Sequence, residues 1–152
     1  MLFAGLRCAE VLSLRPRDVD LSRYLLRVRG KGQKERVVPI EPELETYLLD
    51  WRARRAAGDR FFLTLAGQPV GDRYVREMVG RYALKAGING VHPHLLRHTC
   101  ATAWLEERGL ELHEVQLLLG HSKLETTQRY LHASLPKLVR RFRQFSRPGP
   151  GA

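Results

Sequence analysis

The chain has 152 residues, enough for one domain with a substantial core, and 43% of them are hydrophobic, an ordinary share for a globular protein. No run approaches the roughly 20 apolar residues that a membrane-spanning helix needs. Lysine and arginine number 26 against 16 aspartate and glutamate, which gives a net charge of +10. An excess of this size favours a polyanionic partner, with nucleic acid ahead of an anionic membrane.

The cysteines and the acidic residues give no sign of a metal centre. Two cysteines, Cys8 and Cys100, are too few for a disulfide framework or a metal cluster, so we expect both to be reduced thiols in the core of a cytoplasmic protein. The carboxylates are scattered over turns and a helix start, without metal-ligand spacing. A two-metal phosphoryl-transfer site is therefore not expected, and we expect no metal or other cofactor.

The first part of the chain predicts a short helix, a hairpin and a longer helix. The short helix stops before Pro16, because the residue preceding a proline is driven out of the helical region. Residues 24–40, YLLRVRGKGQKERVVPI, are two apolar-rich runs joined by a turn with two glycines, a β-hairpin pattern. Pro42 begins a helix that we expect to end near Gly58. The stretch 60–65, RFFLTL, is a candidate for a third short strand.

The second part predicts three helices with glycines at their ends. The first covers residues 70–86 and is closed by Gly87, and the next begins at Pro93 and ends before Gly109. A short amphipathic helix follows and stops at Gly120. We therefore expect an α+β fold, mostly α-helical, with a small three-stranded antiparallel sheet.

A further helix carries a tyrosine whose role the spacing alone leaves open. Ser122 and Glu125 form an S-x-x-E capping box that predicts its start. Tyr130 lies about 100° around the helix from Leu131, at the flank of the apolar stripe. Most tyrosines in small domains pack with their hydroxyl in water, so a packing role and a chemical role are both possible.

Six polar residues stand at sequence positions where they could together form a phosphate site. They are Arg7, Lys31, His94, Arg97, His121 and Tyr130. His94 and Arg97 are three residues apart on a helix and project from the same side. If the cations converge, they would stabilise the charge of a pentacoordinate transition state, each contributing on the order of 10²–10³ in rate. A free tyrosine titrates near pH 10, so as a nucleophile it needs such a surround or a nearby base. This set indicates covalent, metal-free phosphodiester transfer.

Four motifs that contain these residues resemble those of the tyrosine recombinases, or phage-integrase family. The motifs are GLRCAEVLSLRPRDVD, RGKGQKERVVPI, HPHLLRHTCATAWLEERG and VQLLLGHSKLETTQRYLH. The likeness is to the catalytic domain, especially that of the Xer-type enzymes, and it extends over essentially the whole chain. The family's catalytic residues then correspond to Arg7, Lys31, His94, Arg97, His121 and Tyr130.

The resemblance implies site-specific DNA recombination. Tyr130 would attack a DNA phosphodiester and form a 3′-phosphotyrosyl link, with His94 assisting proton transfer at the tyrosine. Reversal by a 5′-hydroxyl from a different strand gives recombination, and neither ATP nor a metal is needed. Two non-recombinase alternatives remain: a non-catalytic DNA-binding remnant, and type IB topoisomerase-like nicking and resealing.

The resemblance also assigns the residues that would hold the phosphate. Arg7 and Arg97 would bind the scissile phosphate, with His121 as a further donor, and Lys31 would protonate the departing 5′ oxygen. The resemblance implies that the partner is double-stranded DNA, bound by a homotetramer, and that no membrane takes part. The protein is then expected in the cytoplasm, in association with the nucleoid.

The two ends of the chain carry further expectations from the family. Relatives have an N-terminal domain that clamps the DNA before the first motif, so residues 1–152 are expected to be a catalytic domain truncated at its N-terminus, without the core-binding domain. In relatives the tail docks on a neighbouring protomer. The alternative is a helix folded back on its own domain, and the apolar residues of the tail suit both: Leu135, Leu138, Val139 and Phe142.

Overall fold

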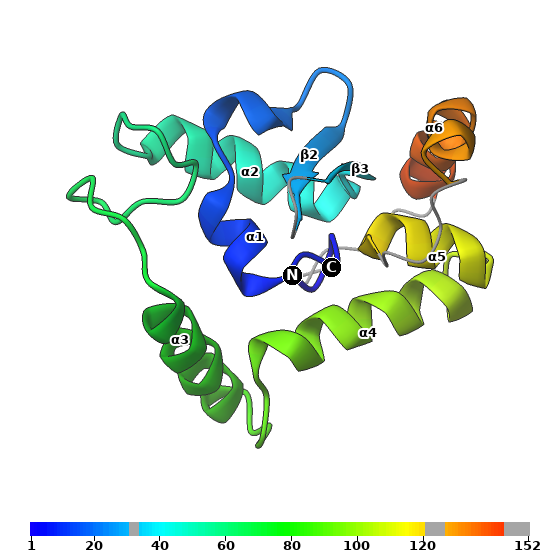
Figure 1. Cartoon of the computed structure of the whole chain (residues 1–152). Helices are drawn as coiled ribbons and strands as arrows, with labels where there is room; N and C mark the ends of the chain where they lie inside the picture. Colours follow the sequence, from blue (N-terminus) through cyan, green and yellow to red (C-terminus); the bar gives the residue numbers. More distant parts are fainter. Residues whose placement is uncertain (31–33, 121–126, 145–152) are drawn as a thin grey trace.

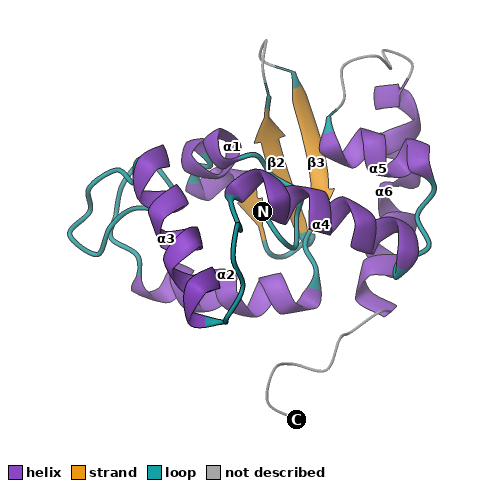
Figure 2. Cartoon of the chain, turned by 90° about the horizontal axis from the view of Figure 1, so that it is seen from below, coloured by secondary structure: helices purple, strands orange, loops and turns teal. Residues whose placement is uncertain are grey.

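The computed structural model describes residues 1–30, 34–120 and 127–144, excluding the side chains of 127–134 and 137. In this part of the chain, six helices and a small sheet surround one hydrophobic core (Figure 1). The elements are α1 (Cys8–Ser13), the 3-10 turn η1 (Pro16–Asp18), β1 (Val19–Asp20), β2 (Leu25–Arg29), β3 (Glu35–Pro39), α2 (Pro42–Arg54), α3 (Asp72–Lys85), α4 (Pro93–Glu106), α5 (Leu112–Leu119) and α6 (Thr127–Gln144). This is the expected mostly α-helical α+β fold. Helices α3 and α6 lie at opposite ends of the molecule, as Figures 1 and 2 both show.

The sheet is antiparallel, in the order β1-β2-β3, and it confirms the predicted hairpin. In the central strand, Leu26 lies opposite Val19 on one side and Val38 on the other. These side chains are buried, whereas Arg27 and Arg29 point away from the core because successive residues of a strand face opposite sides. One face of β2 is therefore apolar and the other is cationic.

The expectation of a strand at residues 60–65 is wrong, since the third strand of the sheet is β1. The backbone of this stretch bonds to other groups: the Phe61 nitrogen donates to the Leu14 oxygen (2.7 Å). The Phe61 oxygen accepts from the side chains of Trp51 (2.9 Å) and Arg55 (3.1 Å). Because groups outside the sheet satisfy this backbone, the segment buries Phe61 and Leu63 as an irregular loop, without joining the sheet.

The predicted helices are confirmed, with shifts of a few residues at their ends. Helix α2 ends at Arg54, and α3 begins at Asp72. The residue after α5, Gly120, has a φ of 70° and ends the helix in the left-handed conformation that glycine adopts without strain. The capping box expected ahead of α6 lies outside the described residues.

The C-terminal helix α6 packs on its own domain. Leu138 and Phe142 are 1% and 0% exposed, and the Phe142 ring meets the fully buried Trp104 of α4 edge to face, with centroids 5.7 Å apart. Arg141 of α6 forms an ion pair with Glu114 of α5 (3.2 Å). Of the two arrangements considered for the tail, the structure has the folded-back one.

Both cysteines are free thiols. Cys100 is buried as expected, whereas Cys8 is half-buried at the start of α1 and lies outside the core. Within the described part of the chain, no helix is both long and apolar enough to cross a lipid bilayer.

Candidate active site

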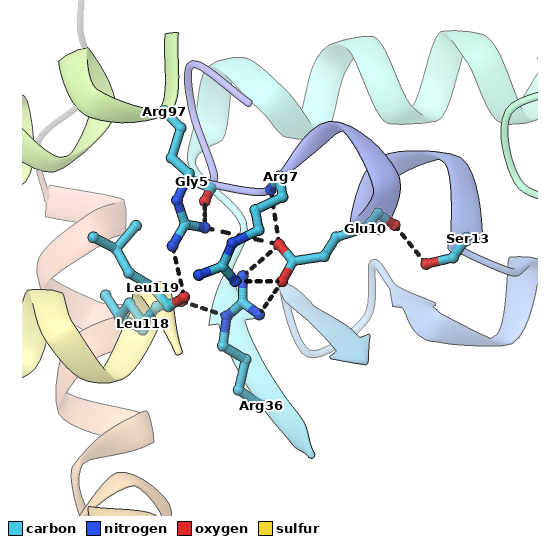
Figure 3. Close-up of polar contacts among 8 residues, drawn as sticks. All are labelled: Gly5, Arg7, Glu10, Ser13, Arg36, Arg97, Leu118 and Leu119. Carbon is cyan, nitrogen blue, oxygen red and sulfur yellow. Dashed lines mark hydrogen bonds and ion pairs between the residues drawn. The ribbon is translucent and has the colours of Figure 1, made fainter. Parts of the chain in front are cut away.

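Three arginines from three separate elements gather around the buried carboxylate of Glu10 (Figure 3). Arg36 of β3 donates to both carboxylate oxygens, at 2.7 and 2.8 Å, in a bidentate pair. Arg7 donates from its backbone nitrogen (2.7 Å) and from Nη1 (3.0 Å). The Nη1 atom of Arg97, in α4, lies 3.8 Å from the carboxylate. We call these four residues the arginine cluster.

Helix α1 fixes the position of Glu10. Arg7 is the residue that caps the N-terminus of α1, and Glu10 is the third residue of the helix. Its carboxylate bonds back to the Arg7 backbone nitrogen, one of the donors that a helix leaves unpaired at its start. A negative charge is also favoured at this end of a helix by the peptide dipoles.

The C-terminal end of α5 holds the other side of the cluster. The Leu118 oxygen accepts from Arg36 Nε (2.6 Å), and the Leu119 oxygen accepts from Arg97 Nη2 (2.8 Å). Arg97 also donates to the Gly5 oxygen. The last carbonyls of a helix lack partners within the helix and attract cations. Two guanidinium groups thus complete the end of α5 and fix it beside α1 and β3.

Two glycines permit this close packing. Gly5 has a φ of 58°, and a Cβ at this position would lie 2.8 Å from a methyl group of Leu119. A Cβ on Gly120 would lie 3.0 Å from the Arg36 side chain, again at a positive φ. Any side chain at either position would strain the backbone and displace the cluster.

The cluster carries more positive than negative charge, and its groups shift one another's pKa values. Burial disfavours ionisation of Glu10 and is the largest single influence, but the hydrogen bonds from Arg36 and Arg7, with their charges, outweigh it and lower the pKa of Glu10. Burial, with the nearby Arg7 charge, lowers the pKa of Arg97 to about 10, so this group is still cationic at neutral pH. Three guanidinium groups face one carboxylate, which leaves an excess of two positive charges.

The three guanidinium groups differ in how accessible they are. The side chain of Arg7 is 47% exposed, whereas those of Arg36 and Arg97 are 8% and 5% exposed. Arg7 therefore presents a half-exposed guanidinium beside two buried ones that supply positive potential. Such a preorganised set of donors suits the oxygens of a phosphate group.

The structure brings together two of the six residues singled out from the sequence, Arg7 and Arg97. His94 is exposed on α4, and its ring stacks with that of His92 at 6.5 Å, so its described contacts lie outside the arginine cluster. Lys31 and His121 lie outside the described residues. Tyr130 belongs to helix α6, and its side chain is likewise outside the description.

The sequence analysis missed Glu10 and Arg36. A signal for Arg36 was present, because in the strand ERVVP it alternates with Val37 and shares the inward side with Val38. An arginine at an inward strand position requires a buried acceptor. Glu10 stands three residues after Arg7, the spacing of a reciprocal helix cap. Among the described residues, no group of three or more His, Cys, Asp and Glu could hold a metal ion.

The fold and the motifs together define the class of the protein. The phage integrase family matches residues 1–135, so the chain belongs to this family. The chain is 42% identical, over 159 aligned positions, to the tyrosine recombinase XerC of Bifidobacterium longum, an alignment that covers 95% of this chain and 44% of the relative. The chain thus spans less than half the length of the curated relatives it matches.

Solved structures of Xer recombinases have the same fold. The XerA recombinase is 30% identical with a TM-score of 0.73, over 97% of this chain and 56% of that one. The XerH site-specific recombinase, bound to its difH substrate in a pre-cleavage complex, is 29% identical with a TM-score of 0.69, over 90% of this chain and 42% of that one.

Proposed function

We propose that the chain is the catalytic part of a site-specific DNA recombinase that cuts and rejoins DNA strands through a phosphotyrosyl intermediate. The observation that carries this proposal is the arginine cluster, in which guanidinium groups from three elements converge around Glu10. Its excess positive charge suits a phosphodiester, and membership of the phage integrase family makes DNA the expected polymer.

In the proposed reaction, the Tyr130 oxygen bonds to the phosphorus while the bond from phosphorus to the 5′ oxygen breaks. His94 assists removal of the tyrosine proton, and Lys31 gives a proton to the departing 5′ oxygen. The enzyme is left joined to the 3′ phosphate. A 5′-hydroxyl from another strand reverses these steps, so one phosphoester replaces another without an external energy source.

The phosphate would be held by Arg7, Arg97 and His121. Arg97 is fixed by its bonds to Gly5 and Leu119, so its charge costs little reorganisation when the substrate binds. Glu10 acts as a positioning residue, because it accepts from Arg7 and lies 3.8 Å from Arg97. Arg36 holds Glu10 in place through its bidentate pair.

The proposed partner is double-stranded DNA, bound by a homotetramer. The net charge of +10 and the DNA complex of XerH support the first part. In the tetramer, the part of α6 that follows Tyr130, from residue 134 on, would move to a neighbouring copy. Because Leu138 and Phe142 would find the same site there, the exchange keeps the same contacts. Sedimentation on DNA with and without residues 134–152 tests this, and unchanged assembly after the deletion would contradict it.

Covalent trapping tests the chemistry. The chain is incubated with a pool of nicked suicide DNA substrates, on which a cut strand cannot be rejoined, beside the Tyr130→Phe variant. We expect a protein–DNA adduct that survives denaturation and is absent from the variant. Salt-sensitive binding without an adduct would instead indicate a DNA-binding remnant, and relaxation of supercoiled plasmid without recombinants would indicate topoisomerase-like activity.

A further inference from the structure

A second cationic hollow lies beyond the C-terminal end of α1, on the face of β2 that points away from the core. It measures about 500 Å³, and its lining includes Arg15, Arg27, Arg29 and Arg60. The single carboxylate in the lining is that of Asp18, which is 5% exposed and accepts from the Arg15 backbone nitrogen (2.9 Å). The hollow therefore has a marked excess of positive charge.

Three of the four guanidinium groups keep their charge available. Arg29 pairs with Glu35 (2.8 Å) and lies 3.9 Å from Asp18. Arg15, Arg27 and Arg60 form no ion pair with any residue that the structure describes. Unopposed guanidinium groups gathered in one hollow repel one another, and an anion placed among them relieves this cost.

The fold holds these groups in place. Arg27 and Arg29 stand two residues apart on the outer face of β2, whose inner face is in the core. Arg60 donates from Nη1 to the Ser13 oxygen (2.9 Å), which fixes its guanidinium at the end of α1. Planar donors fixed in this way match the oxygens of a phosphate diester.

The hollow adjoins the arginine cluster. Gly30 belongs to its lining, and a Cβ on Gly30 would lie 3.8 Å from Glu10 Oε1 and 3.9 Å from Arg36 Nη1. Helix α1 has Arg7 at its start and Ser13 at its end, and its six residues span about 9 Å. This length is short enough for the two sites to contact nearby phosphates of one DNA strand.

We propose that this hollow binds a backbone phosphate of the DNA close to the phosphate held by Arg7 and Arg97. The assignment rests on the proposed function, since it takes DNA as the substrate. A second phosphate contact fixes the strand along α1 and sets which phosphodiester reaches the arginine cluster, because phosphate contacts determine register without reading sequence.

The test compares two variants with the same loss of charge. Arg15→Gln with Arg27→Gln removes two arginines of the hollow, and Arg52→Gln with Arg140→Gln removes two exposed arginines on α2 and α6. Binding to a duplex of random sequence is measured by fluorescence anisotropy between 50 and 200 mM salt. Each lost phosphate contact should reduce the slope of log K against log salt by about 0.9. The hollow variant is expected to lose about 0.9 from the slope, the loss of one phosphate contact, and the control variant to match the unaltered chain.

Each alternative outcome is distinct. Equal slopes for the two variants would overturn the hollow as a phosphate site while leaving the proposed function intact. Absence of salt-dependent binding by the unaltered chain would overturn both proposals. Thermal stabilisation by inorganic phosphate that is lost in the hollow variant, with an unchanged slope on DNA, would assign the hollow to free phosphate and overturn the DNA assignment. The single variant Arg27→Gln, at an exposed position, repeats the test if the double variant unfolds.

Discussion

Replacing Glu10 by glutamine removes the one negative charge around which three guanidinium groups are arranged. The side chain keeps its size and one acceptor oxygen, so the change is electrostatic more than steric. Glu10 is 4% exposed and its main partner Arg36 is 8% exposed, so water cannot replace the lost charge. Breaking a buried ion pair by removing one partner costs about 3–5 kcal/mol, because the other charge stays buried and unpaired.

The expected effect on thermal unfolding follows from the size of the chain. For domains of about 150 residues, a loss of 1 kcal/mol lowers Tm by about 2–4 °C. Taking about 3 kcal/mol, the lower end of the range, Glu10→Gln should melt about 6–12 °C below the unaltered chain when circular dichroism is followed at pH 7. Arg7 and Arg97 lose their shared anchor in the same variant, so the yield of covalent adduct should fall as well.

An exposed ion pair supplies the matched control. Glu77 pairs with Arg73 one turn away on α3, with side chains 59% and 92% exposed. Because exposed pairs of this kind contribute about 0.3–0.5 kcal/mol, Glu77→Gln should lower Tm by no more than about 2 °C. A Glu10→Gln variant that melts within about 2 °C of this control would refute the view that the carboxylate holds the cluster together.

Three further predictions follow from burial and ionisation. The pKa of Glu10 is lowered in the folded chain, so its contribution to stability is present above its ordinary pKa near 4.5 and is lost as pH falls through the folded value. The difference in Tm between the unaltered chain and Glu10→Gln should therefore shrink as the pH of the melt is lowered through this range. Phe142→Ala should lower the free energy of unfolding, measured in urea, by about 3–5 kcal/mol, because Phe142 is fully buried. The control Leu65→Ala, at a 77% exposed position, should lower it by less than about 0.5 kcal/mol, and equal losses would contradict the packing of α6. Burial raises the pKa of Cys100 to about 12, and burial with a hydrogen bond to a carboxylate raises that of the half-buried Cys8 to about 11. At pH 8, Cys8 should therefore react slowly with Ellman's reagent in the folded chain, and Cys100 should react only after unfolding.

Local patterns allowed much of the fold to be predicted from the sequence. The hairpin carries apolar runs around a glycine-containing turn, and the helices begin at prolines or end at glycines such as Gly120. These signals depend on a few adjacent residues, so they survive without knowledge of the tertiary structure. The stretch 60–65 misled the analysis because Trp51 and Arg55 satisfy its backbone from outside, and such partners leave no mark on the local sequence.

The candidate site could be predicted only in part, for the same reason. Arg7 and Arg97 stand in motifs that resemble a known family, and the structure brings them together. Glu10 and Arg36 were missed because their roles depend on contacts between residues 26 positions apart, and the Leu118 oxygen lies 82 positions from its donor. Neither separation has a periodicity that a single sequence reveals.

The wide spacing of these contacts has a consequence for the synthesis of the protein. Arg36 is synthesised 82 residues before the Leu118 oxygen that accepts its hydrogen bond. At about 5–20 residues per second, this delay is roughly 4 to 16 s. During that interval Arg36 lacks the carbonyl that fixes its guanidinium group, and the cluster is incomplete. The arginine cluster is therefore assembled only after α5 has been synthesised.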